Sequence, residues 1–196
     1  RFAEVRRDLV SSQRAEADLP FSSACSTIED KYQRDNWCED GYFRVGVPHE
    51  GQELTPYHDW QLGWVGGGMV PLPFLLNGVP QSRERALRNL EWMFTRAQHD
   101  SGLFHVIQHK GKPIGDGFGK PGTDAWYMVR KQSDALYFLV KTFYALQARD
   151  EHWTLPSHWA DGTARLADRL SDTFLRFGEL GQYLNCDTGD VVVGGS

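Results

Sequence analysis

Apolar side chains recur at helical spacing in four parts of the chain. Residues 64–76 and 131–148 are apolar on nearly every side, and this pattern predicts two buried helices. Residues 82–98 and 157–177 carry apolar side chains on one face and charged side chains on the other, which predicts two amphipathic helices. Because buried and amphipathic segments alternate, we expect two concentric helical layers, with inner helices covered on all sides and outer helices wetted on one.

The connections between these segments alternate in length as well. The stretches 77–81 and 149–156, which follow the buried helices, are short, whereas 99–130 and 178–190, which follow the amphipathic helices, are long. Long loops on a rigid scaffold often carry binding and catalytic residues. The alternation therefore predicts helical hairpins whose long loops gather at one end of the fold.

The N-terminal part of the chain is less regular. Residues 1–17 are polar with a thin apolar stripe, which predicts a helix that ends at Pro20 and the serines after it. Residues 30–60 are rich in aromatic and acidic side chains and are expected to be irregular. Short strands are expected at 41–45 and 103–106.

Composition and charge narrow the class of protein. With 196 residues, 40% of them hydrophobic, the chain can form a sizeable core. We expect one domain over residues 1–196, with 1–40 as an N-terminal segment. The net charge of −5 and the lack of a basic stripe argue against a nucleic-acid-binding protein. No apolar run approaches the ~20 residues of a membrane-spanning helix, so no membrane span is expected.

The ends of the chain and its cysteines bear on processing and redox state. The chain starts at Arg1 and ends in an apolar and then glycine-rich run at 191–196, which favours an interrupted chain, a piece of a larger protein. No signal peptide is visible, and the localisation stays open. Three cysteines, an odd number, leave both a Cys25–Cys38 disulfide and three free thiols open. Because no two cysteines form a CxxC pair, a zinc site built on cysteine is not expected.

Three segments together resemble the six-hairpin glycosidase-like superfamily: residues 57–67 (YHDWQLGWVGG), the amphipathic helix at 83–98, and residues 130–136 (RKQSDAL). The resemblance covers residues 41–196. It implies an all-α fold, the (α/α)6 toroid of alternating inner and outer helices, here with short strands in the long loops. It also implies that substrate enters at the end that carries those loops. Only two hairpins are predicted, so the chain would be part of a toroid.

Carboxylates in the long loops are the candidates for catalysis. Glycoside hydrolysis needs an acid that protonates the leaving oxygen and a second carboxylate that acts as base or nucleophile. Asp59, Asp124 and Asp134 are the best-placed acids. The alternative for Asp134 is an ion pair with Arg130, one helical turn earlier. For Asp124 it is an acid at a helix N-terminus, stabilised by the helix dipole.

Polar and aromatic neighbours complete the expected sugar site, because sugar rings stack on aromatic faces. The expected substrate-binding residues are His58, Trp60, Trp126, Tyr127 and Arg130. Glu50 and Glu53, in a loop with glycine and proline, are expected to be solvated loop acids. His58 and His109 both remain open as general bases, because imidazole titrates near neutral pH.

Metal and nucleotide chemistry are not favoured. His105 and His109 have a spacing that suits metal ligands on a helix, but their segment looks extended, where such positions lie about 13 Å apart. The run GDGFGK at 115–120 lacks the spacing of a phosphate loop and is followed by Pro121. We therefore expect no metal and no cofactor.

The leading hypothesis is a carbohydrate-active enzyme that hydrolyses glycosidic bonds of an oligosaccharide or polysaccharide. One alternative is a polysaccharide lyase acting on a uronate-containing glycan. In that enzyme Tyr57 or His58 would be the base, and Arg44 or Arg130 would hold the acid group. A second alternative to the hydrolase is a non-catalytic helical module that binds a glycan or a protein. Because a partial toroid would expose apolar faces, association with the rest of the toroid or a homo-oligomer is expected.

Overall fold

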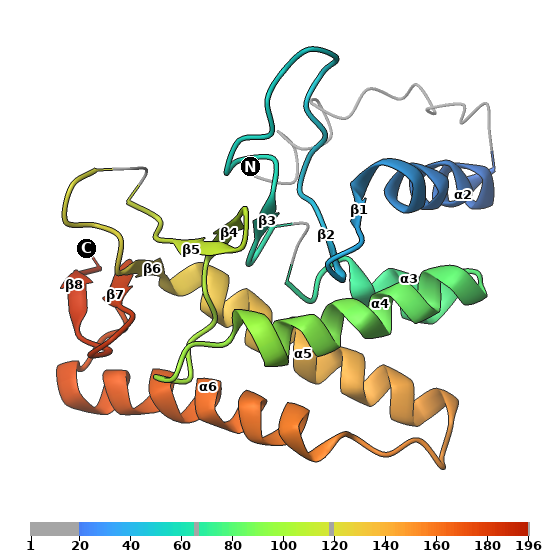
Figure 1. Cartoon of the computed structure of the whole chain (residues 1–196). Helices are drawn as coiled ribbons and strands as arrows, with labels where there is room; N and C mark the ends of the chain where they lie inside the picture. The colour runs from blue at the N-terminus through green and yellow to red at the C-terminus, as the bar shows by residue number, and fades with distance from the viewer. Residues whose placement is uncertain (1–19, 65–66, 118–119, 196) are drawn as a thin grey trace, which may run out of the picture.

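The computed structural model describes residues 20–64, 67–117 and 120–195. Within these ranges five α-helices make up most of the regular structure (Figure 1). They are α2 (Phe21–Lys31), α3 (Pro71–Asn77), α4 (Pro80–Trp92), α5 (Val129–Arg149) and α6 (Ser157–Phe177). Two π-helical turns, η1 (Tyr32–Asn36) and η2 (Met93–Ala97), continue α2 and α4.

Short strands form three small antiparallel sheets in the described part of the chain. The strands are β1 (Trp37–Cys38), β2 (Tyr42–Phe43), β3 (Trp60–Gln61), β4 (Ile107–His109), β5 (Lys112–Ile114), β6 (Trp126–Met128), β7 (Tyr183–Asn185) and β8 (Val191–Val193). β1 pairs with β2, and the other two sheets have the orders β3-β4-β5 and β6-β7-β8. The register sets Trp60 opposite Gln108 and Tyr127 opposite Leu184.

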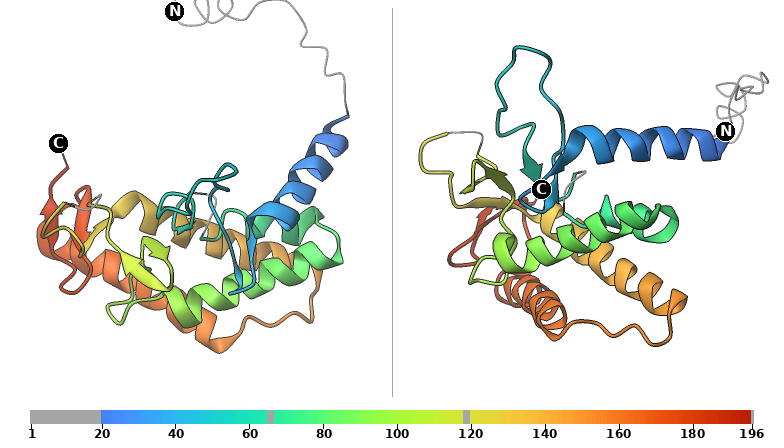
Figure 2. Two further views of the ribbon diagram at one scale, coloured as in Figure 1. Left: turned by 45° about the horizontal axis from the view of Figure 1, so that its top comes forward. Right: turned by 45° about the vertical axis from the view of Figure 1, so that its right-hand side comes forward.

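Helices α4, α5 and α6 run alongside one another, and the short and the long connections between helices lie at opposite ends of this group. In Figure 1 the short α3–α4 and α5–α6 connections lie at the right-hand end, where the chain leaves α5 and enters α6. Strands β4 to β8 and the long segments that carry them lie toward the left-hand end, and the views in Figure 2 agree. The first turn of α5 and the last turn of α6 are therefore next to the sheets.

The predicted all-α toroid is wrong. The structure is 48% helical and 13% strand, with three small antiparallel sheets, and is a mixed α/β fold. The expected inner layer fails as well, because α5 leaves Tyr137, Val140 and Tyr144 exposed instead of being covered on all sides. All of the strands except β2 escaped the sequence analysis, because each has only two or three residues, too few for an alternating pattern.

The bounds of the longer helices were predicted well. Helix α6 confirms the prediction over 157–177, and α5 confirms the one over 131–148 with slightly wider bounds. The helix predicted over 82–98 is confirmed too, although it begins at Pro80 and ends in the π-helical turn η2. Proline suits the first turn of a helix, where its missing N–H would have no partner in any case.

The buried helix predicted over 64–76 is only partly correct. Gly67 and Gly68 adopt positive φ angles of 40° and 85°, which a right-handed helix does not allow, so the helix starts at Pro71. Val65 and Gly66 of this prediction lie outside the described residues, as does the whole helix predicted over 1–17.

The two predicted strands fare differently. The strand expected at 41–45 is present as the shorter β2. The prediction of a strand at 103–106 is wrong. Phe104 makes only an isolated bridge with Gln98, and β4 begins later, at Ile107.

Helix α2 forms where the sequence predicted only an end. Pro20 immediately precedes the first residue of this helix, and the serines after it are helical. None of its residues is buried. The Glu29 carboxylate accepts a hydrogen bond from the Val79 N–H at 2.9 Å, which ties α2 to the start of α4.

Aromatic rings fill much of the core. Phe43, Trp60 and Phe104 are fully buried. The Trp159 ring stacks on Phe94 and Phe143, with centroids 5.7 and 6.0 Å away. Such pairs add to the free energy gained by burying their area, and they bind α6 to η2 and α5.

The cysteines form no disulfide with one another. Cys25, Cys38 and Cys186 are all free thiols, so the Cys25–Cys38 disulfide is not formed.

Among the helices of the described ranges, none has both the length and the apolar character that crossing a bilayer requires.

Polar side chains in the first turn of α5 hold two points of the long connection between η2 and α5, at Phe104 and Asp116. Lys131 Nζ lies 2.5 Å from Asp116 Oδ1, and both side chains are buried. The Gln132 amide donates to the Phe104 carbonyl at 2.7 Å and accepts from the Phe104 N–H at 2.9 Å. Gly63 packs so closely on this turn that a Cβ there would lie 2.7 Å from the Lys131 Cα.

We predict that Asp116→Asn lowers the free energy of unfolding by about 3–5 kcal/mol, because it leaves the Lys131 ammonium buried without a counter-charge. Equilibrium urea denaturation measures the change. Asp134→Asn is the matched control: it removes the exposed i,i+4 partner of Arg130 and should cost less than about 1 kcal/mol. Equal losses in the two variants would show that the buried pair is not a major anchor.

Candidate functional site

Asp59 is the candidate acid that the fold surrounds most completely. It immediately precedes β3 and is only 1% exposed. Its backbone carbonyl accepts a hydrogen bond from the Val45 N–H at 3.1 Å, which holds the segment after β2 against it. Pairing of β3 with β4 then brings the end of β4, His109, to the same place.

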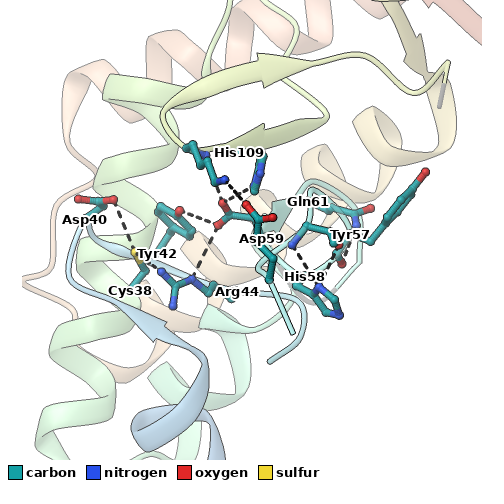
Figure 3. A network of polar contacts seen from close by, with 12 residues as sticks. Cys38, Asp40, Tyr42, Arg44, Tyr57, His58, Asp59, Gln61 and His109 are labelled. Carbon is teal, nitrogen blue, oxygen red and sulfur yellow. Dashed lines mark hydrogen bonds and ion pairs between the residues drawn. The ribbon is translucent and has the colours of Figure 1, made fainter. Parts of the chain in front are cut away.

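Four groups converge on the two oxygens of the Asp59 carboxylate (Figure 3). The Tyr42 hydroxyl donates to Oδ1 at 2.7 Å, and Arg44 Nε lies 3.9 Å from the same oxygen. His109 Nδ1 lies 3.1 Å from Oδ2, which also accepts from the Lys110 N–H at 3.4 Å. We call Asp59, Tyr42, Arg44, His109 and Lys110 the Asp59 network.

A tight turn aims the Lys110 amide at this carboxylate. Lys110 and Gly111 join β4 to β5, with φ angles of 50° and 74°. Positive φ at both central positions is typical of the two-residue hairpin turn that matches the twist of the flanking strands. Among the described residues Lys110 is the one side-chain-bearing residue with positive φ, and such a backbone often occurs at functional sites.

Burial and the Asp59 carboxylate set the protonation of Tyr42. Burial is the main reason that the pKa of Tyr42 lies far above its usual value, and its hydrogen bond to Asp59 adds to the effect. Tyr42 therefore stays protonated and donates to the carboxylate. The His109 and Arg44 side chains are partly exposed, so they connect the buried carboxylate to the surface.

Glu53 places a second carboxylate at the same site. Its Oε1 lies 2.8 Å from Lys110 Nζ, and its side chain is 80% exposed. The hydrogen bond from Lys110 lowers the pKa of Glu53, and the nearby His109 contributes in the same direction. A buried acid and an exposed, ionised acid thus flank His109 and Lys110.

Asp134 and Asp124 lie in other settings. Asp134 Oδ2 accepts from Arg130 Nη1 at 2.7 Å within α5. The Arg130 guanidinium also donates to the Gly63 carbonyl at 3.3 Å and lies 5.9 Å from the centroid of the Trp64 ring, which is 55% exposed. Trp64, Arg130 and Asp134 therefore form a surface cluster. Asp124 is exposed in the turn before β6.

The remaining predicted binding residues have mostly structural contacts. Trp60 is fully buried and packs edge-on against Trp92, so its faces are not open to a ligand. His58 Nδ1 contacts the Thr55 hydroxyl at 2.9 Å within its own turn. Trp126 is half-buried beside Tyr183.

Tyr127 is buried and pairs with a histidine. Its hydroxyl lies 2.5 Å from His105 Nδ1. Burial raises the pKa of Tyr127, and burial lowers the pKa of His105 to about 4, with the neighbouring His99 adding to the decrease. Near neutral pH the imidazole is therefore uncharged and the phenol protonated.

The sequence analysis named Asp59 and, as an open general base, His109, but it did not predict that the other side chains of the network would meet them. Tyr42 was not a candidate, Arg44 entered only through the lyase alternative, and Glu53 was assigned to solvent. Lys110-Gly111 between two apolar-flanked segments was the available signal, because it marks a hairpin turn that would bring 107–109 close to its neighbours.

A groove and a metal-ligand cluster lie apart from these carboxylates. The groove, of about 1090 Å³, is lined mainly by apolar residues of α2 and α3, with Trp64 and Arg130 at one side. His99, Cys186 and Asp187 are the group of potential metal ligands that comes together in the described ranges. Neither feature includes Asp59, Glu53 or His109.

Comparison of the chain with protein-family models, with curated proteins and with solved structures found no significant match.

We predict that Asp59→Asn lowers the free energy of unfolding by about 1–3 kcal/mol, because one amide oxygen cannot replace both carboxylate oxygens as acceptors for buried donors. Thermal and urea unfolding measure the loss. Asp40→Asn is the matched control on the same side of the fold, since Asp40 is exposed and contacts the Cys38 sulfur at 3.6 Å. A loss no larger than that of the control would contradict the importance of the network for the fold.

Proposed function

We propose that this chain belongs to a carbohydrate-active enzyme that hydrolyses glycosidic bonds, with the Asp59 network and Glu53 as its reaction centre. The observation that carries the proposal is the convergence of an ionised, exposed carboxylate and a carboxylate-bound imidazole on one hairpin turn. This hydrolysis requires a group that transfers a proton to the leaving oxygen and a carboxylate that acts as base or nucleophile.

Glu53 fits the role of the carboxylate that activates water or attacks the sugar. Its exposure gives a substrate access, and its lowered pKa keeps it ionised near neutral pH. Lys110 holds the side chain through a 2.8 Å ion pair. The same pair keeps the carboxylate beside His109.

His109 fits the role of the group that gives and takes the proton. Asp59 binds its Nδ1, which fixes the ring orientation and leaves Nε2 for proton transfer, as in other carboxylate–imidazole pairs. Because Asp59 is buried, it acts as a positioning residue through His109 and Tyr42 and does not itself touch the sugar.

Trp64, Arg130 and Asp134 fit a surface that binds sugar. The exposed indole offers a face on which a sugar ring stacks, and the ion pair beside it offers donors and acceptors for hydroxyl groups. Asp134 would then orient the substrate. Asp124 stays a prediction as a catalytic acid, with His58, Trp126 and Tyr127 as predicted binding residues, whereas Trp60 belongs to the core.

A polysaccharide lyase is the second candidate, because Arg44 lies beside the same Asp59 carboxylate as His109. Its buried Nε makes no hydrogen bond among the described residues and faces Asp59 at 3.9 Å. In a lyase His109 would abstract the proton next to a uronate carboxylate, and Arg44 or Lys110 would bind that carboxylate. The reaction leaves an unsaturated sugar, whereas hydrolysis does not.

The test is to incubate the protein with a set of neutral and uronate-containing polysaccharides and to follow new reducing ends and near-ultraviolet absorbance together. We expect reducing ends without absorbance. We also expect Glu53→Gln and His109→Asn to lower kcat about 10²- to 10⁴-fold, the usual contribution of general acid–base groups.

Glu50→Gln is the matched control, because Glu50 is an exposed acid of the same loop and is not part of the Asp59 network. It should keep the activity of the unsubstituted protein. Reducing ends with matching absorbance would identify the lyase. Sugar binding without turnover would identify a binding module, and full activity in Glu53→Gln and His109→Asn would place the reaction centre elsewhere.

A further inference from the structure

Two turns from distant parts of the chain bring a histidine, a cysteine and an aspartate together beside α6. His99 follows η2, and Cys186 and Asp187 follow β7. One ligand atom from each of the three side chains lies within 4.8 Å of the other two. His99 Nε2 is 3.4 Å from Asp187 Oδ1, and Cys186 Sγ is 3.6 Å from the same oxygen.

We propose that His99, Cys186 and Asp187 bind a Zn²⁺ ion. In tetrahedral zinc sites the metal–ligand bonds are about 2.0–2.3 Å, so neighbouring ligand atoms lie roughly 3.3–3.8 Å apart. Both measured separations fall in this range. The mixed sulfur, nitrogen and oxygen donor set is one that zinc accepts and that calcium and magnesium do not.

The turn that carries Cys186 and Asp187 is held in place by hydrogen bonds of its own. The Cys186 N–H donates to the Ala125 carbonyl at 2.8 Å. The Asn185 carboxamide oxygen accepts from the N–H groups of Asp187 and Thr188, at 2.9 and 3.1 Å. Ligands on preformed turns lose little conformational entropy when they bind.

Arg169 of α6 supports both turns at once. Its Nε donates to the Ser101 carbonyl at 2.8 Å, next to His99. Its guanidinium also packs on Gly189, where a Cβ would lie 2.9 Å from Nη1. The relative position of the two turns is therefore fixed by a third element.

The second nitrogen of His99 has a suitable partner. When Nε2 binds a metal, a neutral imidazole carries its proton on Nδ1, and a hydrogen-bond acceptor there orients the ring. The Ser101 hydroxyl oxygen lies 3.0 Å from Nδ1 and can accept a hydrogen bond from the Nδ1–H of that imidazole. This bond would replace the one that the Ser101 N–H donates to Nδ1 at 3.1 Å.

The three ligands differ in exposure, and the site is open to solvent on the side of Asp187. Cys186 is buried, His99 is half-buried, and the Asp187 side chain is 67% exposed. Three protein ligands with a solvent-facing fourth position are the arrangement of zinc sites that bind water or a further ligand. The site lies outside the Asp59 network and stands whether or not the proposed hydrolysis is correct.

The sequence analysis expected no metal because it considered CxxC pairs and the His105–His109 spacing. The proposed ligands have neither pattern. His99 is separated from Cys186 and Asp187 by α5 and α6, and only folding brings them together.

The test is titration of the reduced protein with Co²⁺, a spectroscopic substitute for Zn²⁺, followed by displacement with Zn²⁺. We expect one Co²⁺ per chain, with a thiolate charge-transfer band in the near ultraviolet that Zn²⁺ removes. Cys186→Ser should abolish this band. Asp187→Asn, at an exposed position that does not threaten folding, should weaken Co²⁺ binding at least tenfold.

Cys25→Ser is the matched control, because Cys25 is an exposed thiol outside the site and should leave the band unchanged. The proposal is overturned if the unsubstituted protein shows no band. It is also overturned if Asp187→Asn binds Co²⁺ as tightly as the unsubstituted protein, or if Cys25→Ser loses the band.

Discussion

The polar first turn of α5 is the constraint on which the other features depend. Lys131 binds the buried Asp116, Gln132 pairs with both backbone groups of Phe104, and Arg130 donates to the Gly63 carbonyl. One helical turn therefore holds three segments that come from different parts of the chain. Because buried polar groups are costly without partners, these contacts allow few alternative positions for those segments.

The positions of the residues in the Asp59 network depend on these contacts of the first turn of α5. Phe104 leads directly into β4, whose last residue is His109, and β4 pairs with β3 next to Asp59. On the other side of β3, Gly63 and Trp64 follow within the segment that Arg130 holds. The proposed proton-transfer groups and the proposed sugar-binding surface therefore lie at the two ends of one short strand.

Helix α6 has a similar role at the proposed zinc site. Arg169 reaches both the turn that carries His99 and the turn that carries Cys186 and Asp187. The pairing of β6 with β7 brings Tyr127 alongside Leu184, close to the same turn. Long irregular segments thus become well-defined sites because helices α5 and α6 bind them through side chains rather than through regular backbone ladders.

Periodicity in the sequence determined the long helices and little else. The segment 157–177 alternates apolar and charged residues at helical spacing over several turns, so its limits were predictable. The acid at position 59 was recognisable as a candidate from its aromatic and histidine neighbours. The toroid was what the resemblance of three segments implied, together with the alternation of helices, and the error came from strands too short to leave a pattern in sequence.

Tertiary structure alone decided which side chains meet. Tyr42 and Arg44 come to Asp59 from β2 and the residue after it, His109 comes from the end of β4, and Glu53 joins through Lys110. It also decided that Trp60 is in the core and that His99 faces Asp187. The physical reason is that helix formation depends on residues three or four positions apart, whereas each of these sites depends on pairings between distant segments that no local pattern records.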